Sequence, residues 1–201
     1  MIAEIRGVNP DVVGLQEVAG PTQANEVGRA LNMNVAYVPH ETVRKTGRWW
    51  GVAVLSKFPI RTTRAVEISF GRGNQRTVLV AELDVGARRM TVLSIHKDKD
   101  LHDGSSIANI MEIVAPIEGP VVLAGDFNFT PDKSRGRLEM LRARFVDTQS
   151  RSTRRARMTH GGGAPSCAPS GASTTSSPIP HHFEVLDAGV TLSPYPHPTI
   201  V

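Results

Sequence analysis

Cysteine is almost absent from this chain of 201 residues, in which Cys167 is the single example. One cysteine forms no internal disulfide and no thiolate metal cage, so neither can stabilise the fold. Apolar runs of about 18 residues are also missing, and the sequence therefore predicts no membrane-spanning helix. The first residues, Met1 to Arg6, lack the basic and apolar stretches of a signal peptide, and we expect a cytoplasmic protein.

Aromatic residues make up only 5% of the chain, whereas 40% of the residues are hydrophobic and 21% are charged. These proportions are ordinary for a globular protein, and the length suits one domain spanning residues 1–201. The net charge of +4 favours an anionic or phosphorylated partner only weakly. Many of the basic residues fall between Arg135 and Arg157, where they also suit a solvated segment.

Short apolar runs bounded by Gly and Pro predict an α/β protein. Residues 11–17 and 121–124 suit strands that are buried on both faces. Thr22 is a candidate cap for a helix over residues 23–31. Further helices are expected at 106–114 and 134–143, and further strands at 35–38, 52–55, 64–68, 77–83 and 90–95.

Polar side chains close three of the predicted strands, at Glu17, at His96 and at Asp126 with Asn128. Strand ends of α/β sheets commonly gather functional groups, and a carboxylate suits Mg²⁺ or Mn²⁺. Each residue also has a simpler interpretation. Glu17 fits the first exposed residue of a loop, Asp126 and Asn128 fit turn residues, and His96 fits a strand end beside the solvated charges of residues 97–100.

The order of these motifs resembles the endonuclease/exonuclease/phosphatase superfamily. The similarity covers about Asp11 to Asp147, and its blocks are DVVGLQEV (11–18), GVAVLSKFPI (51–60), SIH (94–96) and GDFN (125–128). The resemblance implies a DNase I-like fold of the α/β (α+β) type, in which two mostly antiparallel sheets pack together between outer helices. It also implies divalent-metal-dependent hydrolysis of phosphate esters.

By this resemblance Glu17 would ligate Mg²⁺ or Mn²⁺, and His96 would be a catalytic histidine that contacts phosphate. Asp126 would position the attacking water, and Asn128 would donate to the phosphate. His197 resembles the catalytic histidine of the last family block.

The chain departs from the family pattern at several positions. Met1 falls within the helix before the Glu17 block, so the preceding strand with its metal-proximal Asn is not seen. Ser94 stands where the family usually has Asn, and Pro196 replaces the aspartate that pairs with the last histidine. These differences predict impaired catalysis.

A further departure concerns the Asp-His-Ile-Phe block, which is missing. Residues 150–182 contain little that can pack, and we interpret them as a disordered or frameshifted loop within the domain. A second reading frame over residues 169–177 can encode Leu-Arg-Arg-Val-Asp-His-Ile-Phe, which matches the missing block.

Three functions therefore compete. The first is a phosphoesterase acting on nucleic acid, a phospholipid headgroup or a small phosphate monoester, and the Trp49–Trp50 pair suits base stacking, a membrane surface or simple strand packing. The second is a catalytically inactive family remnant that binds phosphate weakly. The third is a basic nucleic-acid-binding module based on the arginines between Arg142 and Arg157.

Overall fold

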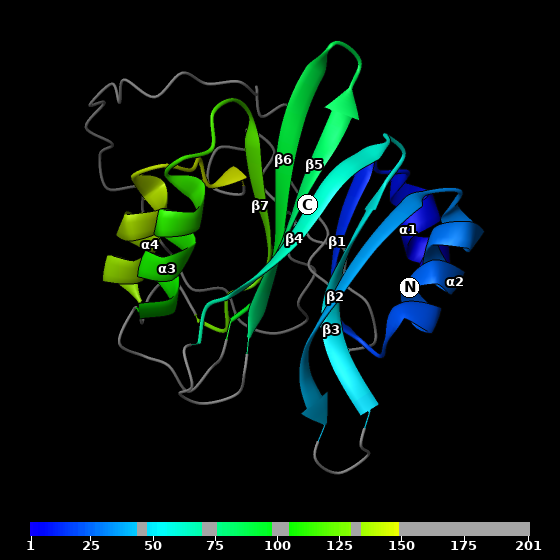
Figure 1. The fold of residues 1–201 in the computed structure, drawn as a ribbon, viewed down its shortest axis with the longest axis horizontal. Coiled ribbons are helices and arrows are strands. Elements are labelled where there is room, and N and C mark those ends of the chain that lie inside the picture. Colours follow the sequence, from blue (N-terminus) through cyan, green and yellow to red (C-terminus); the bar gives the residue numbers. More distant parts are fainter. Residues whose placement is uncertain (44–47, 70–75, 98–104, 130–133, 149–201) are drawn as a thin grey trace, which may run out of the picture.

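The structure is a computed structural model, and it describes residues 1–43, 48–69, 76–97, 105–129 and 134–148. Four helices and seven strands lie within these ranges (Figure 1). In chain order they are α1 (Ile2–Val8), β1 (Val12–Val18), α2 (Pro21–Leu31), β2 (Asn34–Val43), β3 (Arg48–Ser56), β4 (Ile60–Glu67), β5 (Thr77–Val85), β6 (Arg88–His96), α3 (Ser105–Val114), β7 (Val121–Asp126) and α4 (Arg135–Arg142).

The strands form two sheets that pack face to face. The first sheet has the order β1-β3-β2 and the second the order β4-β5-β6-β7. All pairs are antiparallel except β6 and β7, which run parallel and are connected through α3. A parallel pair needs such a crossover, because a tight turn can only reverse the chain.

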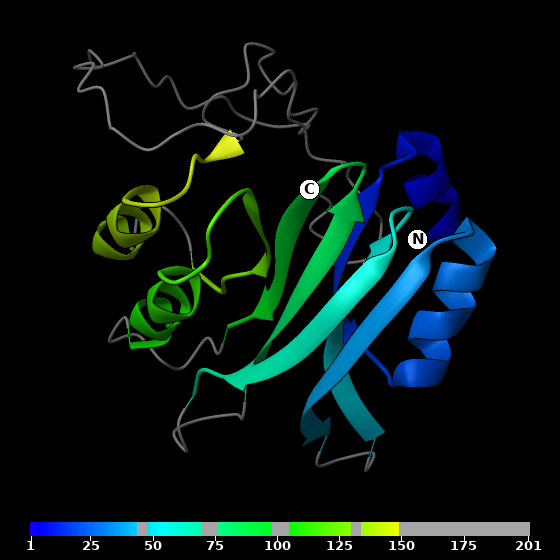
Figure 2. The same ribbon diagram turned by 45° about the horizontal axis from the view of Figure 1, so that its top comes forward.

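Helices cover the outer face of each sheet, as the two views in Figures 1 and 2 show. The alternation of side chains along each strand explains this layering. On β3, Val52 and Val54 belong to the core between the sheets, whereas Ala53 and Leu55 pack with α1 and α2. On β5, Val78 and Val80 join the core under α3 and α4. The predicted four-layer α/β sandwich is confirmed.

The first buried run behaves as predicted. Val13, Gly14 and Leu15 are consecutive buried residues of β1, since one face meets the helices and the other meets the second sheet. The second run differs. In β7 only Ala124 and Gly125 are buried, because within the described residues β7 pairs with β6 alone and lies at the edge of its sheet.

The helices follow the prediction closely, but the expected cap of α2 is wrong. Gly20 occupies the N-cap position with φ 102°, and Pro21 begins the helix. Proline is well suited to the first helical turn because its missing N–H would have no helical partner there. Gln23 instead accepts the Ala19 N–H at 2.7 Å through Oε1. In the part of the chain that the structure describes, no helix is long and apolar enough to cross a membrane.

Candidate active site

The parallel pairing of β6 and β7 brings His96 beside Asp126, since these residues are register partners at the ends of the two strands. The Nε2 atom of His96 lies 3.9 Å from Oδ2 of Asp126. His96 is buried, whereas the Asp126 side chain keeps 29% of its exposure. The carboxylate therefore faces solvent on one side and the imidazole on the other.

Gly125 permits this close approach of the two strands. Its φ is +147°, and a Cβ placed there would lie 2.1 Å from the carbonyl oxygen of Ile95. Only glycine lacks the atom that would collide with β6. The glycine of the GDFN motif therefore has a structural role directly beside the site.

Asn128 folds back onto this strand end. Its backbone N–H donates to Oδ1 of Asp126 at 2.8 Å, and its side-chain Nδ2 donates to the Lys97 carbonyl at 2.7 Å. The φ of Asn128 is 50°, a left-handed conformation that asparagine tolerates better than most residues. Asp126 and Asn128 thus form the predicted turn, and this turn also orients the second carboxylate oxygen toward His96.

Strand β1 of the other sheet packs against the same region. Gln16 donates through Nε2 to the Ser94 hydroxyl at 3.3 Å, and Ser94 donates to the Leu15 carbonyl at 3.4 Å. Glu17 follows in a β-bulge, where β1 carries one residue more than β3 and Glu17 has φ 55°. Its side chain is exposed. The described contacts thus place Glu17 at a neighbouring strand end, without a direct contact to Asp126.

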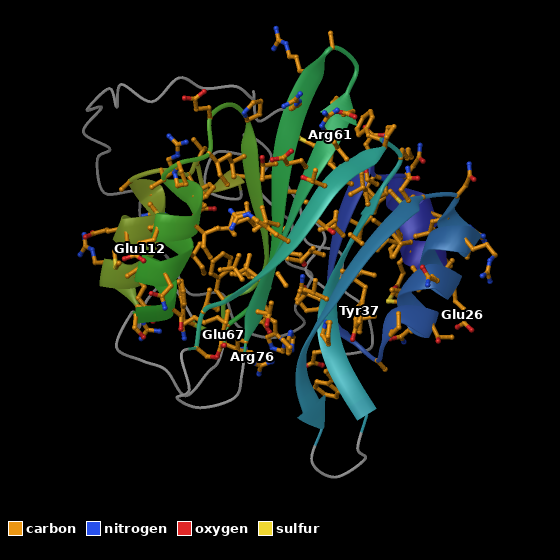
Figure 3. The ribbon with its side chains drawn as sticks, viewed as in Figure 1. Glu26, Tyr37, Arg61, Glu67, Arg76 and Glu112 are labelled. Atoms are coloured by element: carbon orange, nitrogen blue, oxygen red, sulfur yellow. The ribbon has the colours of Figure 1, made fainter. Side chains whose placement is uncertain are left out.

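Three buried basic side chains form a cluster behind the carboxylate. Nη1 of Arg76 lies 2.9 Å from Nε2 of His40 and 3.2 Å from Nδ1 of His96. The two imidazole rings meet edge to face, with centroids 5.5 Å apart. Figure 3 shows Arg76 at the end of the sandwich opposite the β5–β6 hairpin, near Glu67.

The environment of His40 disfavours a charged ring. Burial lowers the pKa of His40 to about 3, and the charge of Arg76 acts in the same direction. Both effects favour the neutral imidazole. His40 is therefore a neutral hydrogen-bond acceptor for Arg76 at neutral pH.

His96 does end its strand, as predicted, but the expectation that solvated charges follow it is wrong for Lys97. The Lys97 side chain is completely buried, and its backbone N–H donates to the Asp126 carbonyl at 2.8 Å. This bond continues the β6–β7 ladder by one residue, which draws Lys97 inside. Residues 98–100 lie outside the described part of the chain.

The carboxylates at this site meet only some of the requirements of a site for a hard cation such as Mg²⁺. Within the described residues no three His, Cys, Asp or Glu side chains gather as a metal site would require. Magnesium, however, typically takes one or two protein carboxylates and completes its shell with water and phosphate. The exposed carboxylate of Glu17 and the partly exposed one of Asp126 are oxygen donors of that kind.

Sequence reasoning missed His40 and Arg76, and it found Ser94 only as a departure from the family pattern. The strand around Val35 was expected to end at Val38, whereas β2 continues through His40 to Val43. Arg76 stands directly before an apolar strand, a position where an arginine is ordinarily solvated, so no pattern in the sequence indicated that it joins a buried cluster. His197 lies outside the described residues, as does the whole predicted loop at 150–182.

The chain belongs to the endonuclease/exonuclease/phosphatase family, since the sequence profile of that family matches residues 1–183. This finding confirms the resemblance seen in the motifs. None of the curated protein sequences matches the chain significantly.

Solved structures share the fold at low sequence identity. A family protein from Leptotrichia buccalis C-1013-b has a TM-score of 0.64 and 16% identity, over 76% of this chain and 69% of that one. A functionally unknown protein from Enterococcus faecalis V583 has a TM-score of 0.65 and 18% identity, over 76% and 65% of the two chains. ANGEL2, a 2',3'-cyclic phosphatase solved with adenosine-2',3'-vanadate, has a TM-score of 0.51 and 22% identity, over 65% of this chain and 43% of its own.

Proposed function

We propose that this chain is a divalent-metal-dependent phosphodiesterase with weak activity. The observation that carries the proposal is the juxtaposition of His96 and Asp126 at adjacent strand ends, with Asn128 bonded to the same carboxylate. Phosphoester hydrolysis requires a water molecule to be oriented and deprotonated while donors offset the charge on phosphate. These three side chains supply an acceptor and two donors in one place.

Asp126 is assigned to the attacking water. Asn128 holds Oδ1 of its carboxylate, so Oδ2 is the oxygen that remains directed toward His96 and solvent. The Asn128 amide carries two N–H groups, and the bond to the Lys97 carbonyl fixes its orientation. We assign its second N–H to a phosphate oxygen, and a phosphate-contacting role to His96.

Glu17 is the residue that we assign to Mg²⁺ or Mn²⁺. Such an ion, when bound, polarises the phosphate and offsets its developing negative charge. The contribution of the chain is to present an oxygen ligand from the bulge of β1, whose neighbouring residues Leu15 and Gln16 contact Ser94 of β6. The exposure of Glu17 supports this assignment, because Mg²⁺ usually keeps several waters and an exposed carboxylate leaves room for them.

Weak activity is proposed from the sequence of the last family block. His197 keeps its imidazole, but Pro196 stands in place of the aspartate that the family pairs with it. A paired carboxylate fixes the tautomer of a catalytic histidine and stabilises its charged form. The rival function is a catalytically inactive remnant that binds phosphate weakly. The same reasoning supports it in the case where the missing aspartate abolishes catalysis altogether.

The basic-module hypothesis receives less support. Arg142 forms an ion pair with Asp147 at 3.3 Å, and Arg144 donates to the Ile117 carbonyl at 2.9 Å. These two arginines serve local packing around α4. The remaining arginines of the predicted basic run lie outside the described residues.

The test measures hydrolysis of bis(p-nitrophenyl) phosphate, plasmid DNA and a phospholipid headgroup ester with Mg²⁺ and with chelator. We expect slow, chelator-sensitive turnover that Asp126→Asn abolishes and that Pro196→Asp raises. Asp84→Asn is the matched control, since Asp84 is a similarly exposed carboxylate far along the sheet, paired with Arg61. Turnover that survives both chelation and Asp126→Asn would contradict the proposal, and metal-independent, salt-sensitive DNA binding without turnover would favour the basic module.

A further inference from the structure

We propose that Arg76 is a positioning residue that fixes the ring proton of His96 on Nε2, and that His40 holds Arg76 in place. The state in question is the tautomer of His96, that is, which of its two ring nitrogens carries the proton. Its consequence for catalysis rests on the proposed function. The tautomers themselves follow from the contacts within this cluster.

The direction of the hydrogen bonds determines the tautomers. A guanidinium group has five N–H donors and no acceptor, so an imidazole nitrogen bonded to arginine must accept. Nη1 of Arg76 carries two hydrogens, and it lies 2.9 Å from His40 Nε2 and 3.2 Å from His96 Nδ1. Each hydrogen therefore serves one ring, and each of these ring nitrogens carries a lone pair.

A neutral imidazole has one N–H, so the second nitrogen of each ring carries the proton. In His96 this is Nε2, the atom that faces Oδ2 of Asp126 at 3.9 Å. In His40 it is Nδ1. The arrangement is favourable electrostatically, because the N–H dipole of His96 points at the carboxylate while its lone pair points at the guanidinium.

Burial and backbone hydrogen bonds favour this arrangement of the cluster. His40, Arg76 and His96 retain only 2%, 6% and 4% of their exposure, so bulk water does not compete for their hydrogen bonds. The backbone of Arg76 is fixed as well. Its N–H donates to the Ser69 hydroxyl at 2.9 Å, and its carbonyl accepts the Ile68 N–H at 2.9 Å.

The consequence is a division of labour between His96 and Asp126. A ring that carries its proton on Nε2 cannot accept another proton at that atom. His96 therefore acts as a neutral hydrogen-bond donor, and the carboxylate of Asp126 takes the proton of the attacking water. Loss of Arg76 allows the proton to move to Nδ1, which turns the donor side of His96 into an acceptor.

The test is the nitrogen NMR spectrum of the full-length, ¹⁵N-histidine-labelled chain at pH 7.5, with His40 and His96 assigned by His→Gln variants. We expect opposite tautomers, in which Nδ1 of His96 and Nε2 of His40 show unprotonated, acceptor-type shifts. A protonated Nδ1 in His96, or rapid averaging of its two nitrogens, would overturn the proposal. This measurement needs no catalytic activity, so it distinguishes failure of the inference from failure of the proposed function.

Variants of Arg76 test the cause. Arg76→Met keeps much of the apolar stem and removes the donor, and we expect the single His96 tautomer to be lost. Arg76→Lys restores a donor and should restore the spectrum at least in part. Arg64→Met, on the exposed face of β4, is the matched control and should leave the spectrum unchanged.

The hydrolysis assay gives a second readout. Arg76→Met should lower kcat by about 10- to 100-fold, the range typical of a partner that orients a site histidine, with KM much less affected. An unchanged His96 spectrum in folded Arg76→Met would refute the assignment. If Arg76→Met does not fold, the spectrum of the unmodified chain still decides whether His96 carries its proton on Nε2.

Discussion

Lowering the pH from 8 to 5 should destabilise this protein through His40. The folded state lowers the pKa of His40 to about 3, from an ordinary value of 6.5. Between these two values the unfolded chain binds a proton that the folded chain excludes. Since stability rises with pH wherever the unfolded state binds more protons, it must fall as the pH drops below about 6.5.

The magnitude follows from the size of the window. At pH 5 the solution is about 1.5 units below the unfolded pKa, and one unit corresponds to about 1.4 kcal/mol, so His40 alone should cost about 2 kcal/mol. Above pH 7 the ring is neutral in both states and contributes no pH dependence. The loss would grow further toward pH 3.

The assay is urea unfolding at pH 8 and pH 5 of the unmodified chain and of His40→Gln. Glutamine places an oxygen acceptor near Nε2, so Arg76 keeps a partner that does not titrate. The pH-dependent loss should therefore be smaller in the variant by about 2 kcal/mol. Titrating groups that do not contact His40 or Arg76 cancel in this comparison. An equal loss in both proteins would show that His40 is not the buried neutral group described above.

Substitutions at two positions test the GDFN turn. Gly125→Ala should destabilise the chain by more than about 2 kcal/mol, because a Cβ at φ +147° meets the Ile95 carbonyl at 2.1 Å; an unchanged urea midpoint would contradict the close approach of β6 and β7. Asn128→Gly should preserve the left-handed turn better than Asn128→Ala, which adds backbone strain of about 1 kcal/mol, and thermal unfolding of the two variants should rank them in that order.

Much of the fold was predictable because local signals agreed. The apolar run at residues 11–17 and the Asn-Pro entry before it identify β1, and the helical spacing of Ala24 and Val27 identifies α2. Strand lengths were underestimated where polar residues continue a strand past its apolar part. His40 in β2 is an example, since it occupies a strand position but carries no strand signal of its own.

The site was predictable only where it follows the chain locally. Asp126 and Asn128 lie two residues apart, and His96 is joined to them by strand pairing that the order of elements favours. The link to Arg76 depends on how β5 lies against β6, and the link to His40 on how the two sheets pack. A single sequence contains no local signal for contacts of that range.

This difference also explains why stability and site geometry are coupled in this protein. His96 and Asp126 come from the second sheet, but the group that orients Arg76 comes from β2 of the first, and Gln16 of β1 reaches the hydroxyl of Ser94. Any change that separates the two sheets therefore removes the contacts that orient His96, even when His96 and Asp126 themselves stay paired in the second sheet. Acid acts at this junction, because below about pH 6.5 His40 gains a proton in the unfolded chain but not in the folded chain, which favours unfolding. His40 therefore has two roles: its neutral state makes the fold sensitive to acid, and its contact with Arg76 helps to set the donor state of His96.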